Sequence, residues 1–227
     1  AVFSGDYGHF EFREISHEPG PKTLLGKTYS QSDKAQGEAV LRDLSRHRST
    51  ANFIATKLAR HFIADEPPAK VVDQLARVFL ATDGHLPSVY EALIDRHEAW
   101  EQPLAKLKNP NDYVVSSYRA LGVSLRGPQD VLGPLRQLKH PPFTPGSPAG
   151  WPDTAVSWGG EDALLKRIEW AVALGKRTSG QIESPLAIAN DTIGPIADQH
   201  TLLAIERAAS AAQALALLFS SPEFQQR

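Results

Sequence analysis

Cysteine and methionine are both absent from the 227 residues of this sequence. Without cysteine there is no disulfide framework, no thiolate nucleophile and no cysteine-ligated metal. The chain begins Ala-Val-Phe, without an initiator methionine, and we therefore expect a processed product or a piece of a longer protein. No signal peptide is recognisable at its start. No apolar run reaches the roughly 18 residues that a membrane-spanning helix needs, so we predict no membrane span.

An excess of charge of either sign is also missing. Lysine and arginine number 24 and aspartate and glutamate 26, which gives a formal net charge of -2. Such a balanced surface gives no electrostatic reason to expect nucleic acid as a partner. Hydrophobic residues make up 41% and charged residues 22% of the chain. These are globular values, and they argue against disorder and against a coiled coil.

The N-terminal residues 1–35 predict a β-hairpin or extended arm that packs on the rest of the chain. Polar and apolar side chains alternate over residues 9–13, as in a half-buried strand. Residues 17–21 read His-Glu-Pro-Gly-Pro, which is turn chemistry, and residues 22–25 could form the returning strand.

Residues 36–227 predict an irregular multi-helix domain of about eight helices, so the fold class is mainly α. One helix is expected to begin near Ser49 and to bury Phe53, Ile54, Leu58, His61 and Phe62. Another has Asn109 as its N-cap and Gly122 as its C-cap. Residues 175–199 read as irregular, and one long helix is expected over about 201–219. The Pro/Gly-rich residues 139–160 also carry aromatic side chains, which predicts an ordered loop.

Short catalytic and cofactor motifs are absent. Residues 20–28 resemble a phosphate-binding loop, but five residues separate the two glycines where that loop has four, so we reject nucleotide binding. The sequence has no His-Glu-x-x-His zinc pair, no Gly-x-Ser-x-Gly elbow, no calcium loop and no dinucleotide fingerprint. We therefore predict no cofactor and no metal.

Three softer groups of side chains are candidate sites. His17 and Lys22 flank the rigid Pro-Gly-Pro turn near His9, Glu11 and Arg13, and could do acid–base work or simply brace a solvated strand. Arg60 and His61 lie near Lys57 and Asp65, where His61 is either a ligand or a hydrogen-bonded core histidine. Trp151 and Trp158 either form a ligand platform or hold the loop over a core.

Several segments together resemble one known family. These are residues 17–26, 50–62, 147–152 and 221–224, which occur in that family's order. On these segments the chain is similar over essentially its whole length to the large bacterial family known as domain of unknown function 1800. One departure is Arg48, where that family usually has proline before the Ser/Thr, and we expect only a less rigid helix start from it.

The resemblance implies that this chain is the C-terminal half of a longer, mostly helical protein. Members are often exported and are commonly encoded beside a second exported protein, which makes such a bacterial protein the expected partner. No activity is established for the family, so no catalytic residues can be carried over. The resemblance alone favours an exported or periplasmic location, and the oligomeric state stays open.

Two functions follow from these observations. The first is a non-enzymatic helical binding or assembly domain, which the aromatic loop and the lack of catalytic motifs favour. The second is a metal-dependent or hydrolase-like enzyme with a site around His17 and Lys22, completed by a missing N-terminal half. Whether the protein is an enzyme stays open at this point.

Overall fold

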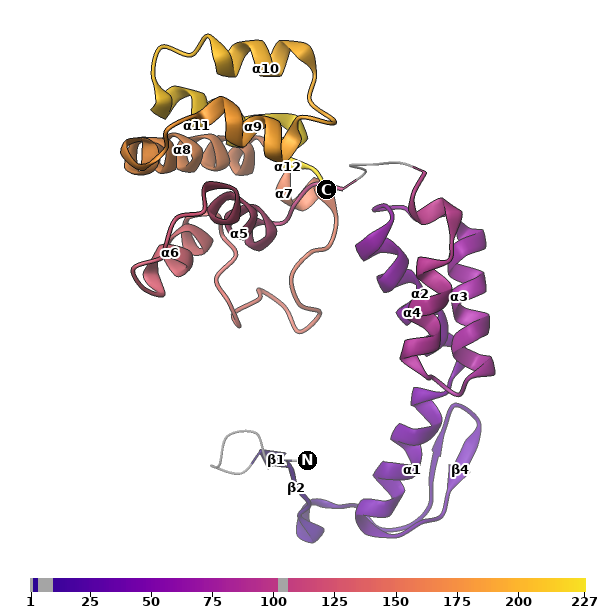
Figure 1. Cartoon of the computed structure of the whole chain (residues 1–227). Coiled ribbons are helices and arrows are strands. Elements are labelled where there is room, and N and C mark those ends of the chain that lie inside the picture. The colour runs from indigo at the N-terminus through magenta and orange to yellow at the C-terminus, as the bar shows by residue number, and fades with distance from the viewer. Residues whose placement is uncertain (1, 4–9, 102–105) are drawn as a thin grey trace. The chain divides into compact units, whose positions relative to one another are not determined.

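The computed structural model of the protein describes residues 2–3, 10–101 and 106–227 (Figure 1). It is mainly helical, with an N-terminal arm and two small two-stranded sheets, which confirms the predicted fold class. Contacts within the chain group the residues into two compact units. The N-terminal unit comprises Ala1–Ala59 and Pro67–Arg96, and the C-terminal unit comprises Arg60–Glu66 and His97–Arg227. The predicted division at residue 35 stays a prediction.

The N-terminal unit contains all four described strands and the first helices. Its elements are β1 (Val2–Phe3), β2 (Phe10–Glu11), the 3₁₀ helix η1 (Glu14–Ser16), β3 (Lys22–Leu24), β4 (Lys27–Tyr29), α1 (Asp33–Ser45), α2 (Arg48–Phe62, up to Ala59 in this unit), α3 (Ala69–Ala81) and α4 (Leu86–Ile94).

The predicted arm is present, but its strands pair differently from the expectation. The segment from residue 22 does not return on residues 9–13, because β3 pairs with β4 and β2 pairs with β1, both antiparallel. The β3–β4 turn consists of Leu25 and Gly26, whose φ angles of 49° and 79° are both positive. Two such residues define the type I′ turn, whose twist matches that of the adjoining strands. His9 lies outside the described residues.

The buried face of α2 differs from the predicted one. Ala51, Ala55 and Ala59 are fully buried, whereas Phe53 is 59% and Phe62 is 61% exposed. Small side chains allow a helix to approach its neighbours closely, so the alanine face, and not the larger apolar one, is covered. His61 is exposed as well, and the expectation of a core histidine is therefore wrong.

The C-terminal unit contains the remaining helices. They are η2 (His97–Ala99), α5 (Pro110–Leu121), α6 (Gln129–Gln137), α7 (Ala155–Trp158), α8 (Glu161–Thr178), η3 (Ser179–Gln181), α9 (Pro185–Ile193), α10 (Gln199–Glu206), α11 (Ala211–Ser220) and α12 (Pro222–Gln225). The described residues thus hold twelve α-helices, more than the eight expected, partly because α7 and α12 are only four residues long.

The large hydrophobic core belongs to the C-terminal unit, and α8 and α11 lie side by side in it (Figure 1). Their close approach depends on Gly175, because a Cβ atom there would lie 2.5 Å from the Ala212 carbonyl oxygen. Tyr113, Trp170 and Phe219 fill the centre of the core, with exposures of 3% or less.

The C-terminal sequence forms more helices than predicted. Residues 175–199 are not irregular, because α8 continues to Thr178 and α9 begins at Pro185, where the Ser184 side chain accepts a hydrogen bond from the Ala187 N–H. The expected helix over 201–219 is two helices. The Ser210 side chain accepts from the Gln213 N–H and so starts α11 anew, which separates it from α10.

Candidate functional site

The N-terminal unit holds a pocket of about 620 Å³ beside α1, and His17 and Lys22 both line it. The ring of His17 lies 5.4 Å from that of Phe12, measured between centroids. The apolar part of the lining comes from Phe10, Phe12, Val40 and Leu41. The structure therefore brings together the first pair of candidate residues, in a pocket with a marked apolar wall.

Basic side chains accompany this apolar wall, and each forms an ion pair at the surface. Lys22 Nζ lies 2.8 Å from Glu18 Oε2, and Lys34 Nζ lies 3.0 Å from Glu38 Oε1. The hydrogen bond and charge of Lys22 lower the pKa of the exposed Glu18 carboxyl. Exposed pairs of this kind contribute little to stability, so they can be exchanged for other partners.

A buried glutamine fixes the turn before Lys22 onto α1. Gln36 is 4% exposed, and its Nε2 donates to the Gly20 carbonyl at 3.1 Å and to the Tyr29 carbonyl at 3.0 Å. The Tyr29 hydroxyl in turn donates to Asp43 at 2.8 Å. Sequence reasoning missed Gln36, because a single glutamine in a helix carries no recognisable motif.

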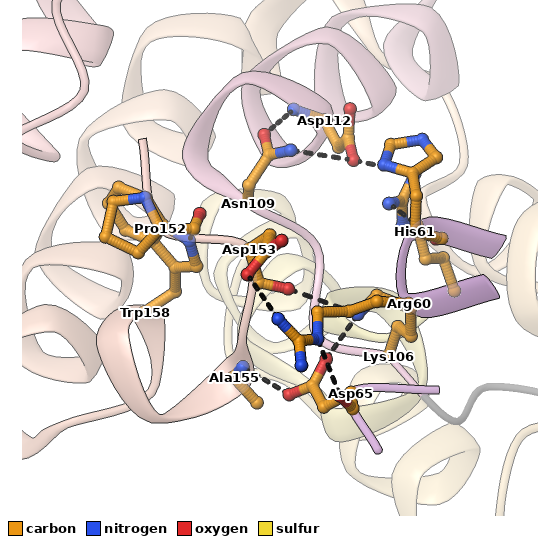
Figure 2. Close-up of polar contacts among 11 residues, drawn as sticks. Arg60, His61, Asp65, Lys106, Asn109, Asp112, Pro152, Asp153, Ala155 and Trp158 are labelled. Atoms are coloured by element: carbon orange, nitrogen blue, oxygen red, sulfur yellow. Dashed lines mark hydrogen bonds and ion pairs between the residues drawn. The ribbon is translucent and has the colours of Figure 1, made fainter. Parts of the chain in front are cut away.

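In the C-terminal unit, Arg60 belongs to a network of charged side chains, as Figure 2 shows. Lys106 is 5% exposed and forms an ion pair with Asp65, and its Nζ also donates to the Asp153 carbonyl at 3.3 Å. Arg60 donates from Nε to the Asp65 carbonyl at 2.9 Å and lies 3.7 Å from Asp153 Oδ1. The other carboxylate oxygen of Asp65 accepts from the Ala155 N–H. The network thus connects three segments of the C-terminal unit, residues 60–65, residue 106 and residues 153–155.

Trp151 and Trp158 surround a histidine in the ordered loop. The His140 ring centroid lies 4.7 Å from that of Trp151 and 5.1 Å from that of Trp158. Trp158 is 7% exposed, and its indole N–H donates to the Pro152 carbonyl at 2.9 Å. Burial lowers the pKa of His140, which keeps the imidazole uncharged near neutral pH. This packing favours a loop-holding role for Trp158.

A smaller pocket of about 200 Å³ adjoins this network, and His61, Trp151 and Trp158 line it. Although His61 is exposed overall, partial desolvation of its ring and the nearby Arg227 lower its pKa. Arg227 donates to the His61 carbonyl at 3.3 Å and lies 3.0 Å from Asp112 Oδ2. The structure therefore gathers Arg60, His61, Trp151 and Trp158 in the C-terminal unit.

The candidate residues fall into two sets. His17 and Lys22 lie in the N-terminal unit, and Arg60, His61, Trp151 and Trp158 lie in the C-terminal unit. Sequence reasoning missed Lys106, His140 and Arg227, because their partners lie far away in the chain. Within the described ranges, no three His, Asp or Glu side chains are grouped as metal ligands would be. No helix there is both long and apolar enough to cross a membrane.

Fold and sites together define a mainly helical protein with a pocket in each unit. The chain belongs to the family described as Protein of unknown function (DUF1800), whose match covers residues 2–226. This confirms the resemblance seen in the sequence. No curated protein and no solved structure matches the chain.

Proposed function

We propose that this protein is a non-enzymatic helical binding domain, and that the pocket of the N-terminal unit holds an apolar, acidic segment of a partner protein. The observation that carries the proposal is the pairing, in one pocket of about 620 Å³, of an apolar wall with several basic side chains. Binding pockets of roughly 300–1,000 Å³ typically combine such a lining with a few polar groups.

The apolar wall supplies the driving force for binding. Leu41 is 67% and Phe10 is 57% exposed, so both side chains face water in the free protein. Fully burying one such side chain contributes roughly 1.5–3 kcal/mol. An apolar partner segment that covers this wall would gain that contribution.

Asp33 and Glu38 also line the pocket, but the basic side chains outnumber them and supply selectivity for acidic partners. Arg13, Lys22 and Lys34 line the pocket, and each forms an ion pair with a nearby glutamate at the surface. Because such pairs are weak, a carboxylate on the partner can replace the glutamate, and complementary charge also speeds association. The family resemblance, and nothing else, supports export and an exported partner.

The first test uses anilinonaphthalene sulfonate, a fluorescent probe with an apolar ring system and one negative charge. Wild-type protein should enhance its fluorescence, and Leu41→Asp should abolish most of this enhancement. Leu165→Asp is the matched control, because Leu165 is 55% exposed and lies in the C-terminal unit. Equal enhancement by wild type and Leu41→Asp would contradict the proposal.

The second test addresses charge. A short amphipathic acidic peptide should displace the probe, and a basic peptide of the same length should not. Lys22→Glu should weaken binding of the acidic peptide. Lys176→Glu, a substitution at an exposed position of the other unit, should leave this binding unchanged. Displacement by both peptides alike would remove the acidic specificity from the proposal.

The enzyme alternative, a metal-dependent or hydrolase-like site around His17 and Lys22, stays a prediction. Its test is the double variant His17→Ala/Lys22→Ala in the full-length protein. If an activity is found in the wild type and this variant loses it while still folded, the enzyme function is supported. If phenotype and folding are both unchanged, the alternative is eliminated.

A further inference from the structure

A second cavity, of about 610 Å³, lies among α5, α9 and α12 in the C-terminal unit. Lys108, Ser116, Arg119 and Thr192 provide hydrogen-bond donors along it, and Phe224 contributes an apolar surface. None of these residues belongs to the pocket around His17 or to the network around Arg60. The cavity is therefore independent of the proposed function.

A buried cation without a carboxylate partner among the described residues contacts the backbone of Lys108, which lines this cavity. Arg167 is 1% exposed and donates to the Lys108 carbonyl at 2.6 Å and to Gln225 Oε1 at 3.4 Å. Its guanidinium also lies 5.0 Å from the centroid of the Tyr113 ring. These partners accept from two of its N–H groups but leave its positive charge uncompensated, and a buried uncompensated charge is costly.

Lys108 adds a second cation at the cavity wall. Its Nζ donates to the Phe224 carbonyl at 2.5 Å and lies 4.1 Å from the centroid of the Phe224 ring. An ammonium group has three protons, so further donors stay available for a ligand. No carboxylate forms an ion pair with Lys108 in the part of the chain that the structure describes.

Two acidic residues, Asp112 and Glu223, also line this cavity, and neither forms an ion pair with Lys108 in the described part of the chain. Asp112 accepts from Asn109 Nδ2 at 3.2 Å and lies 3.0 Å from an Arg227 nitrogen. Glu223 Oε1 accepts from the Asp198 N–H and from the Thr201 hydroxyl, both at 3.0 Å, and its Oε2 is buried without a hydrogen-bond partner among the described residues. Burial and Arg167, opposed by Asp112, lower the pKa of Lys108 to about 8. An anion beside Lys108 would relieve this excess of positive charge.

We propose that this cavity binds an oxyanion, the carboxylate or phosphate group of a ligand, with Lys108 as its primary contact. Arg119 lies further along α5 and forms no ion pair among the described residues. Lys108 precedes α5, and Arg119 lies nine residues beyond the first residue of the helix, Pro110, which corresponds to roughly 14 Å along the helix. A small anion therefore reaches only Lys108, whereas an extended acidic peptide would reach Arg119 as well.

The experiment is a calorimetric titration of the whole protein with inorganic phosphate and with a hexaglutamate peptide, at low ionic strength and between pH 7 and pH 9.5. Both should bind, and the affinity should fall by up to about tenfold per pH unit above the pKa of Lys108, because only the protonated amine attracts the anion. The other charged groups near Lys108 are Asp112, Glu223, Arg167 and Arg227. Absence of binding by both probes, or a pH-independent affinity, would overturn the proposal.

Variants assign the two contacts. Lys108→Arg should keep the affinity at pH 7 but lose its decline with pH, because a guanidinium stays charged. Arg119→Gln should weaken binding of the peptide several-fold and leave the affinity for phosphate unchanged. Arg136→Gln on α6 is the matched control and should change neither affinity. Tighter binding of the peptide than of phosphate identifies an acidic segment as the ligand source, and the reverse identifies a small free anion. Unchanged titrations for both Lys108→Arg and Arg119→Gln would contradict the assignment.

Discussion

The two units of this protein differ in what they bury. The C-terminal unit encloses large aromatic side chains such as Tyr113 and Phe219, together with the charged side chains of Arg167 and Lys106. In the N-terminal unit, α2 buries only alanines, α3 and α4 bury a smaller apolar set that includes Leu75 and Val89, and Leu41 stays exposed. The C-terminal unit also exposes apolar side chains such as Phe143, but the exposed Phe10 and Leu41 lie together in the wall of one pocket. Exposed apolar side chains gathered in this way are available for a partner, and this is why we assign partner binding to the N-terminal unit.

The largest expected effect tests the aromatic core. Phe219→Ala should destabilise the C-terminal unit by about 3–5 kcal/mol, because the ring is fully buried and a cavity would remain. Phe53→Ala, at an exposed position of α2, should change stability by less than about 0.5 kcal/mol. All four tryptophans lie in the C-terminal unit, so their fluorescence during urea unfolding reports on that unit, and amide exchange reports on the other. Equal losses of stability for Phe219→Ala and Phe53→Ala would refute the difference between the two units.

The second effect concerns the buried ion pair. Asp65→Ala leaves the ammonium of Lys106 buried without its partner, and we expect a loss of about 3 kcal/mol. Asp43→Ala, which removes the exposed partner of Lys27, should give a much smaller loss of stability. Urea unfolding followed by tryptophan fluorescence measures the first variant. A negligible loss for Asp65→Ala would show that the network does not hold the loop.

Two glycines provide a comparison of opposite sign. Gly175→Ala should destabilise by about 1–3 kcal/mol, because the added methyl group meets the Ala212 carbonyl oxygen at 2.5 Å. Gly37→Ala in α1 should stabilise by about 0.5–1 kcal/mol, since its Cβ would meet no atom within 4 Å and alanine favours the helix. Thermal unfolding of both variants measures the direction of each change in stability. Stabilisation by both substitutions would show that helix propensity outweighs packing at Gly175.

The smallest effect concerns pH. Burial lowers the pKa of His140, so the unfolded chain binds its proton more readily than the folded chain. The stability from the neutral imidazole is complete above the unfolded pKa of about 6.5 and is lost as the pH falls through the folded value. His140→Gln should therefore flatten the decline in stability between pH 7 and pH 5, and His200→Gln at an exposed position should not. Unfolding midpoints over this range provide the measurement.

Local chemistry explains which parts of the fold the sequence predicts well. Asn109 accepts a hydrogen bond from the Asp112 N–H at the start of α5, and Gly122 ends that helix with a φ of 62°, as expected. The N-cap and the C-cap can both be recognised from a few adjacent residues. The buried face of α2 was mispredicted because large apolar residues outweigh alanine in any hydrophobic pattern, although the alanines are what the fold covers.

The candidate site was only partly predictable for the same reason. Arg60, Asp65 and Trp158 stand out locally, but the partner of Asp65 is Lys106, which is 41 residues away. Such long-range pairs are set by tertiary packing and leave no periodic trace in a single sequence. The pairing of β3 with β4 was missed because the Leu25-Gly26 turn begins with a residue type that rarely has a positive φ.

The most direct test of the binding function is an NMR titration of the labelled protein with the acidic amphipathic peptide. We predict that the amide signals of residues 10–41 shift in a saturable manner, and that Leu41→Asp abolishes these shifts. A peptide that shifts only signals of residues 106–227, or none at all, would contradict the assignment of partner binding to the N-terminal unit.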